Sequence, residues 1–224
     1  DCVSKMNKLL TSMFALAVAS VTAFSAHAQE IKGDAKAAEQ KVAMCIGCHG
    51  IKGYQASFPE VYRVPMISGQ NAKYIASALT AYQKGERKHP TMRGIATSLT
   101  DQDIADLSAY YEQHGKTEPV ATAPKAPDAK VAALLQKGAC VSCHGDNFSK
   151  PIDPSYPKIA GQHKDFLFVA LKSYKVENQA TWGRNNGVMG GIAKQYSNAE
   201  LKAIASYIGS LDGDMKVVPQ SKFR

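Results

Sequence analysis

The sequence lacks an apolar run long enough to cross a membrane. Its longest apolar stretch, residues 9–24, spans 16 residues and contains four hydroxyl side chains, whereas a spanning helix needs about 20 largely apolar residues. Lys8 precedes this stretch and Ala26-His27-Ala28 follows it, which is the small-x-small pattern of a signal-peptidase site. We therefore expect residues 1–28 to be a cleaved signal peptide with a few extra N-terminal residues, and the mature chain to begin near Gln29.

The sequence also lacks a long basic run and any nucleic-acid-binding motif. Without residues 1–28 it carries 25 basic and 18 acidic side chains, a formal net charge of +7. A moderate positive charge of this kind attracts acidic partners without specifying a fold. We expect no nucleic-acid partner, and a basic surface that steers the chain toward an acidic face on another protein.

No alternation of apolar and polar residues is long enough to predict a β-sheet, so the expected fold class is all-α. Residues 117–127 contain three prolines among alanines, a composition typical of a semi-rigid spacer. We predict two helical domains, at residues 29–116 and 128–224, joined by this Pro/Ala-rich linker.

Cysteine is scarce, but its placement is informative. Four of the five cysteines fall in two identical frames, Cys45-Ile46-Gly47-Cys48-His49 and Cys140-Val141-Ser142-Cys143-His144. Each frame reads CxxCH, the attachment motif for c-type haem. In a helical turn the two thiols lie on one face and reach the two vinyl groups of one porphyrin, while the histidine reaches the iron. A disulfide pair or half a zinc site would use the same cysteines. Two copies, each followed at similar distance by a methionine, favour two covalently bound haem c groups.

The repeat extends beyond the two CxxCH motifs. Residues 65–70 (Pro-Met-Ile-Ser-Gly-Gln) align with residues 157–162 (Pro-Lys-Ile-Ala-Gly-Gln) at an offset of 92, which also aligns an apolar stripe at 74–82 with one at 166–174. Further along, the offset becomes 97 and pairs Met92 with Met189. The two halves are therefore homologous and differ by five residues in one loop.

Three helices are expected in each half. An amphipathic helix leads into each CxxCH motif, at about residues 34–45 and 128–140, and the apolar stripe forms a middle helix. The last helices start with the capping-box patterns Thr100-x-x-Asp103 and Ser197-x-x-Glu200. Their apolar faces consist of Ile104, Leu107, Tyr111, Leu201, Ile204 and Ile208.

The CxxCH motif places His49 and His144 on one side of each iron, which leaves the opposite ligand to be found. Met92 follows His49 by 43 residues and Met189 follows His144 by 45, each in a loop just before the last helix. Only these two methionines lie far along the chain and recur in both halves. The methionines that fail one of these conditions are Met44, Met66 and Met215. His89 has no histidine counterpart in the second half, so we interpret it as an exposed loop residue.

Together these features resemble cytochrome c4, a two-domain family of class I cytochromes c. The resemblance covers both CxxCH motifs, both Pro-x-Ile-x-Gly-Gln segments, both stripe helices and both late methionines. It implies two tandem class I cytochrome c domains in a periplasmic electron carrier, often loosely associated with the membrane, that delivers electrons to a terminal oxidase or another reductase. It also implies haems that meet through their propionate edges, and backbone carbonyls at Pro65 and Pro157 that face the free ring nitrogens of the haem histidines.

Histidine and methionine on both sides leave neither iron a vacant position for a substrate, and methionine sulfur favours the ferrous state. The sequence therefore predicts outer-sphere electron transfer and no enzymatic activity. Two alternatives remain: an electron-accepting subunit of a larger dehydrogenase, and a dihaem peroxidase in which one iron loses its sixth ligand. Arg87, Arg184 and Trp182 are candidate hydrogen-bond donors to the propionates, with a solvated loop as the alternative.

Overall fold

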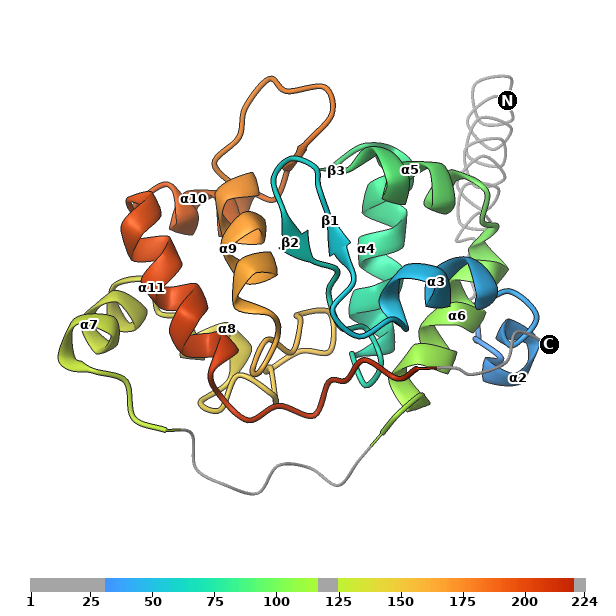
Figure 1. Cartoon of the computed structure of the whole chain (residues 1–224), viewed down its shortest axis with the longest axis horizontal. Helices are drawn as coiled ribbons and strands as arrows, with labels where there is room; N and C mark the ends of the chain where they lie inside the picture. The colour runs from blue at the N-terminus through green and yellow to red at the C-terminus, as the bar shows by residue number, and fades with distance from the viewer. Residues whose placement is uncertain (1–30, 117–124, 220–224) are drawn as a thin grey trace, which may run out of the picture. The chain divides into compact units, whose positions relative to one another are not determined.

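The computed structural model of the chain describes residues 31–116 and 125–219 (Figure 1). The predicted signal peptide, residues 1–28, lies outside the described residues, and so does most of the predicted linker, residues 117–127. From Lys32 onward the described residues form one compact unit. None of the helices in these ranges has the length and hydrophobicity needed to cross a bilayer.

The secondary structure is helical in both halves, as predicted, and the strands are only two residues long. The elements of the first half are α2 (Ala35–Ala38), α3 (Ala43–His49), β1 (Gln55–Ala56), β2 (Tyr62–Arg63), α4 (Ala72–Lys84), β3 (Arg87–Lys88), α5 (Pro90–Thr97) and α6 (Asp101–Gln113). Those of the second half are α7 (Ala129–Lys137), α8 (Val141–His144), α9 (Lys164–Ser173), β4 (Gly183–Arg184), α10 (Gly187–Ala193) and α11 (Asn198–Gly209).

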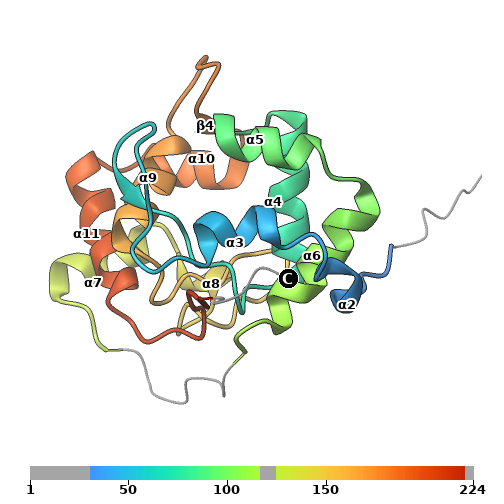
Figure 2. The ribbon, with the colours of Figure 1, turned by 45° about the vertical axis from the view of Figure 1, so that its right-hand side comes forward.

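Each half has its own hydrophobic core. In the first half α6 packs against α2 and α4, and in the second half α11 packs against α7 and α9. In both views α4 and α9 lie between α6 and α11 (Figure 1 and Figure 2). Both predicted capping boxes are present, at Thr100 and Ser197. The predicted apolar faces are buried throughout, at Ile104, Leu107 and Tyr111 on α6 and at Leu201, Ile204 and Ile208 on α11.

The helix that leads into the first CxxCH motif is interrupted, so the prediction of one helix at about residues 34–45 was wrong, whereas α7 follows the helix predicted at about residues 128–140 and ends three residues earlier. Residues 39–42 form turns between α2 and α3. Ala38, Val42 and Ile46 nevertheless stay buried at four-residue spacing across the break, because the apolar period reports which side faces the core and not whether the helical hydrogen bonds continue. In the second half α7 stops at Gly138, where a side-chain Cβ would lie 2.5 Å from the Tyr196 hydroxyl.

The two halves are joined by backbone pairing and by ion pairs. Strand β1 pairs antiparallel with β2 within the first half, whereas β3 pairs antiparallel with β4 of the second half and sets Arg87 opposite Arg184. Arg63 on β2 binds the Asp165 carboxylate on α9, with Nε at 3.0 Å from one oxygen. Lys172 on α9 pairs with Glu60 at 2.5 Å.

After α11 the chain runs back to the first half (Figure 1). The backbone N–H of Lys216 donates to the carbonyl of Ser68 at 3.1 Å. Met215 is buried, and its sulfur lies 3.2 Å from Nε2 of Gln70 and 3.9 Å from Nε2 of Gln162. This C-terminal segment therefore closes the interface around one glutamine from each half.

Candidate functional site

The first CxxCH motif occupies α3. Cys45 packs against the core of the first half, and Cys48 follows one turn later on the same helix. His49 ends the helix, and its Nδ1 lies 2.7 Å from the carbonyl oxygen of Pro65. A carbonyl can only accept, so Nδ1 must carry the proton. The opposite nitrogen, Nε2, therefore keeps its lone pair for a metal.

The second motif repeats this arrangement on a shorter helix. Cys140 packs against the core of the second half and is the N-cap of α8, which ends at His144. Nδ1 of His144 lies 3.2 Å from the carbonyl oxygen of Pro157. The following Gly145 has φ +77°, and a Cβ at this position would lie 2.1 Å from the carbonyl oxygen of Lys150. Only glycine fits there without displacing the loop that supplies Pro157.

Within the described residues, no disulfide involves any of the four cysteines of the two motifs. Burial raises the pKa of Cys45 to about 11 and also raises the pKa of Cys140. Within the described residues, no group of three or more His, Cys, Asp or Glu side chains could hold a metal ion. Each pair of cysteines directly precedes a histidine that a backbone carbonyl orients, and this arrangement fits attachment to one porphyrin.

Both motif histidines are held neutral. Burial lowers the pKa of His49 and of His144 and outweighs the opposing effect of the carbonyl hydrogen bond in each case. Neutral imidazole with its Nδ1 proton already bonded is the form that ligates iron, and the bonded carbonyl fixes both its tautomer and its ring orientation.

Met92 and Met189 occupy the same position in two equivalent short helices. Each methionine is the third residue of its helix, α5 or α10, and not a loop residue as predicted. In both helices the methionine N–H donates a hydrogen bond to the side chain of the N-cap residue. Met92 donates to His89 at 3.4 Å, and Met189 donates to Asn186 at 2.9 Å. Both methionine side chains are half-buried.

The interpretation of His89 as an exposed loop residue was therefore wrong. His89 is half-buried and caps α5. Asn186, its partner at the offset of 97, caps α10. Both residues offer a side-chain acceptor to the first turn of a helix, and this shared property explains why one half can use histidine and the other asparagine. The offset that paired the two methionines would have identified this pair as well.

Two arginines lie together where the halves meet. Arg87 and Arg184 face each other across β3 and β4, and each guanidinium donates to a tyrosine hydroxyl, Arg87 to Tyr74 at 3.2 Å and Arg184 to Tyr174 at 3.4 Å. Burial alone would raise the pKa of Tyr74, but the two guanidinium charges hold it below its usual value. The two guanidinium charges therefore make the surroundings of the Tyr74 hydroxyl positive.

This positive region fits an anionic group. The Nε atom of Arg87 is buried and has no hydrogen-bond partner, and within the described residues no carboxylate forms an ion pair with either arginine. Buried charge is costly unless it is paired, and the carboxylates of haem propionates would supply the missing acceptors. The residues present therefore fit the group that the CxxCH motifs imply.

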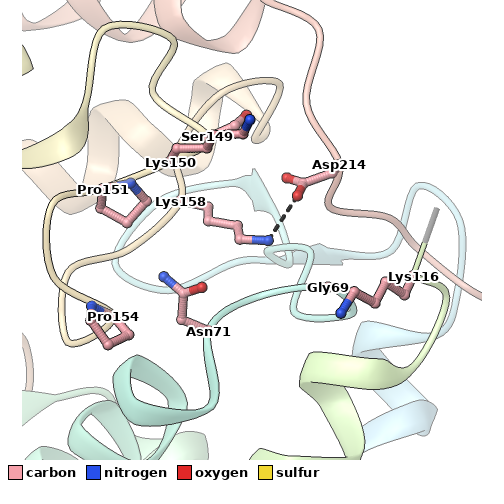
Figure 3. Close-up of a pocket in the computed structure, with 9 residues that line it drawn as sticks. All are labelled: Gly69, Asn71, Lys116, Ser149, Lys150, Pro151, Pro154, Lys158 and Asp214. Carbon is pink, nitrogen blue, oxygen red and sulfur yellow. Dashed lines mark hydrogen bonds and ion pairs between the residues drawn. The ribbon is translucent and has the colours of Figure 1, made fainter. Parts of the chain in front are cut away.

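The structure also contains a cavity of about 290 Å³ elsewhere in the interface (Figure 3). The ion pair between Lys158 and Asp214, 2.7 Å long, lies at its wall. None of the eight cysteines, histidines and methionines predicted to bind haem lines this cavity. It is therefore separate from the haem-binding residues.

The three methionines set aside from the sequence have other places. Met44 is exposed beside Cys45, and Met215 is buried between the halves. The backbone of Met66 bonds to Gln162 of the second half.

Each half presents CxxCH on a helix, a histidine oriented by a backbone carbonyl, and a methionine on a separate capped helix. These features define a c-type cytochrome with two haem-binding halves. The sequence pattern of the family described as Cytochrome c matches residues 35–114 and 129–212. Cytochrome c4 of Pseudomonas aeruginosa is 32% identical over 213 residues, which cover 92% of this chain and 100% of that protein. The chain therefore belongs to the cytochrome c4 family, is a dihaem electron-transfer cytochrome, and carries two covalently bound haem c groups.

Two further comparisons agree with this assignment. The crystal structure of reduced recombinant cytochrome c4 from Pseudomonas stutzeri matches with a TM-score of 0.60 and 28% identity, over 80% of this chain and 100% of that one. A protein named thiosulfate dehydrogenase electron acceptor, from Stutzerimonas stutzeri, is 29% identical over 86% of this chain and 89% of its own length. Relatives of these two kinds indicate that the partners of this chain are redox proteins.

Proposed function

We propose that this chain is a periplasmic electron carrier that takes electrons from a respiratory donor and delivers them to a terminal oxidase or reductase. His49 and Met92 bind one haem iron, and His144 and Met189 bind the other. Cys45 and Cys48 attach the first haem, and Cys140 and Cys143 attach the second.

The equivalence of the two methionine helices is the observation that carries this proposal. Met92 and Met189 occupy the same turn, next to the same kind of side-chain cap. If His49 with Met92 and His144 with Met189 hold the two irons, neither iron would be open to a substrate, which favours a carrier over a peroxidase. Histidine and methionine ligation also raises the reduction potential relative to two histidines.

The haem supplies reversible one-electron chemistry, and the chain supplies attachment, orientation and electrostatics. Pro65 and Pro157 orient the two histidines through the carbonyl bonds described above. Arg87 and Arg184 would bind the propionates and offset their negative charge. Trp182, half-buried next to β4, is a third candidate donor.

The basic net charge supports docking to an acidic surface on the partner. The signal-peptide pattern at residues 1–28 supports export to the periplasm, and peripheral attachment to the membrane is compatible with this location. If long-range attraction guides docking, association should slow as salt rises, because the screening length falls to about 8 Å near physiological ionic strength.

A second candidate function is that of an electron acceptor dedicated to a dehydrogenase. The relative named thiosulfate dehydrogenase electron acceptor favours this reading, because it matches over most of both chains. The two candidates differ in the partner that exchanges electrons rapidly with this chain. The carrier gives electrons to a terminal oxidase, and the acceptor takes electrons from a dehydrogenase.

The test uses the purified holoprotein and follows haem absorbance. Reduced protein is mixed with membranes that contain a terminal oxidase, and oxidised protein is mixed with thiosulfate and a thiosulfate dehydrogenase. The carrier proposal expects oxidation by the membranes that is faster than in air alone and that slows with salt. Rapid reduction in the second mixture, with no acceleration in the first, would replace it by the acceptor role.

A further inference from the structure

Two buried glutamines cross between the halves and bind equivalent backbone groups. Gln162 accepts from the N–H of Met66 at 3.0 Å and donates to its carbonyl at 2.9 Å. Gln70 forms the same pair of bonds with Lys158, both at 2.9 Å. Residues 66 and 158, like residues 70 and 162, are equivalent at the offset of 92. We call these paired contacts the glutamine clamps.

Each clamp ends on the peptide group that orients a haem histidine. The Pro65 carbonyl, which accepts from His49, and the Met66 N–H, which donates to Gln162, belong to one peptide group. A continuous hydrogen-bonded chain therefore runs from Gln162 in the second half to His49 in the first.

The mirror-image chain runs in the other direction. The N–H of Lys158 donates to Gln70, and the carbonyl of the same peptide group, at Pro157, accepts from His144. Both glutamines are buried, with 5% and 4% of their surface exposed. Water therefore competes little for these bonds.

Such a chain affects the electronic character of the histidine. A peptide whose N–H is bonded becomes a better acceptor at its carbonyl, by about 10–30% per bond in condensed phases. A stronger acceptor at Nδ1 makes the imidazole a more basic ligand. A more basic ligand stabilises the ferric state and lowers the reduction potential.

We propose that Gln70 and Gln162 are positioning residues that each tune the reduction potential of the haem in the opposite half. The inference rests on the proposed ligation of iron by His49 and His144. It gives the interface a role beyond holding the halves together, because each half sets the ligand strength of the other.

A purely structural role for the glutamines makes a different prediction. If they only hold the halves together, removing one of them loosens the interface and affects both haems alike. If they tune the ligands, removing Gln162 affects the haem of the first half, and removing Gln70 affects the haem of the second half.

The test compares the holoprotein with its Gln162→Leu and Gln70→Leu variants in a redox titration followed by NMR. The methionine methyl signals report the two haems separately and are assigned with Met92→Ala and Met189→Ala. We expect Gln162→Leu to raise the potential of the first-half haem and leave the other in place, and Gln70→Leu to do the reverse. The Nδ1 proton signal of His49 should also move in Gln162→Leu.

Two further variants sharpen the comparison. Gln162→Glu keeps an acceptor for the Met66 N–H, so its first-half potential should lie at or below the wild-type value, the opposite direction from leucine. This variant also serves if Gln162→Leu does not fold. Gln102→Leu is the control, because Gln102 binds the carbonyl of Lys32 at 3.1 Å and the carboxylate of Asp106 at 2.7 Å within its own half, and it should leave both potentials in place.

Equal shifts of both potentials, a shift in the same half as the substitution, or no shift would overturn the proposal. Failure of the ligation itself is visible separately. In that case the wild-type protein already lacks a low-spin histidine–methionine spectrum in one half, before any glutamine is changed.

Discussion

His89 accepts a hydrogen bond from the backbone N–H of Met92, at 3.4 Å from Nδ1 to the nitrogen. The bond fixes the first turn of α5, and this turn is what presents Met92. The cap on α10 does the same for Met189 with an asparagine. The caps therefore link helix formation to the proposed iron ligand in both halves.

The first prediction concerns this cap. His89→Asn copies the second half and should leave the unfolding free energy and the haem spectrum close to wild type. His89→Ala removes the acceptor and should cost about 1 kcal/mol, the usual loss for a helix N-cap. Urea unfolding, followed by the haem absorbance, measures both variants. An alanine variant as stable as the asparagine variant would show that the cap contributes nothing.

The second prediction tests the two methionine ligands. Met92→Ala and Met189→Ala should each remove one methionine-ligated low-spin signal and lower the potential of that haem, because the sulfur that favours ferrous iron is lost. Met44→Ala is the control, since Met44 is 42% exposed and adjoins Cys45. An unchanged spectrum in either of the first two variants would assign the ligand to another residue.

The third prediction separates the two attachment sites. Cys45→Ser and Cys140→Ser should each lower covalent haem content in one half only, because each cysteine belongs to a different core. Haem-stained gels and the intact mass of the protein report the number of attached haems. Two fully attached haems in both variants would contradict the assignment of these thiols.

The fourth prediction concerns the interface at acid pH. Burial would raise the pKa of Asp165, but its hydrogen bonds with Arg63 and the backbone hold it below the ordinary value of 3.8. The folded protein therefore binds this proton less readily than the unfolded chain. The stabilisation is present above pH 3.8 and is lost as the pH falls through the lower folded value.

Asp165→Asn should remove this acid-sensitive contribution, which we expect to be about 1 kcal/mol or less because the pair is partly exposed. Urea unfolding between pH 5 and pH 3 gives the unfolding free energies of wild type and variant. The difference between these two free energies should shrink as the pH falls. Asp212→Asn, at an exposed carboxylate near the C-terminal segment, is the control. A difference that grows toward acid pH would reverse the assigned sign.

The sequence repeat predicted most of the structural features that lie within a single half. The CxxCH motifs were recognised directly, and the offset of 97 located both late methionines, both capping boxes and the buried faces of α6 and α11. These features depend on local hydrogen bonds and on the apolar period, which residues close together in the sequence determine. The equivalence of His89 and Asn186 could not be recognised by matching residue types, because a helix N-cap requires only a side chain that accepts a hydrogen bond.

The contacts between the halves could not be predicted in the same way. Gln70 and Gln162 were visible as a repeated pair, but a repeat shows which residues are equivalent and not which ones touch. The crossed contacts arise from the packing of one half on the other, with Met215 between them. The break at residues 39–42 likewise depends on how α2 and α3 pack, which an uninterrupted apolar period does not reveal.

The most direct test of the account is a redox titration of the native holoprotein with optical and electron paramagnetic resonance spectra at each potential. We predict two covalently bound haems per chain, two one-electron steps, and a low-spin histidine–methionine signature for both irons. A haem count other than two, or a high-spin iron in the resting protein, would contradict this prediction.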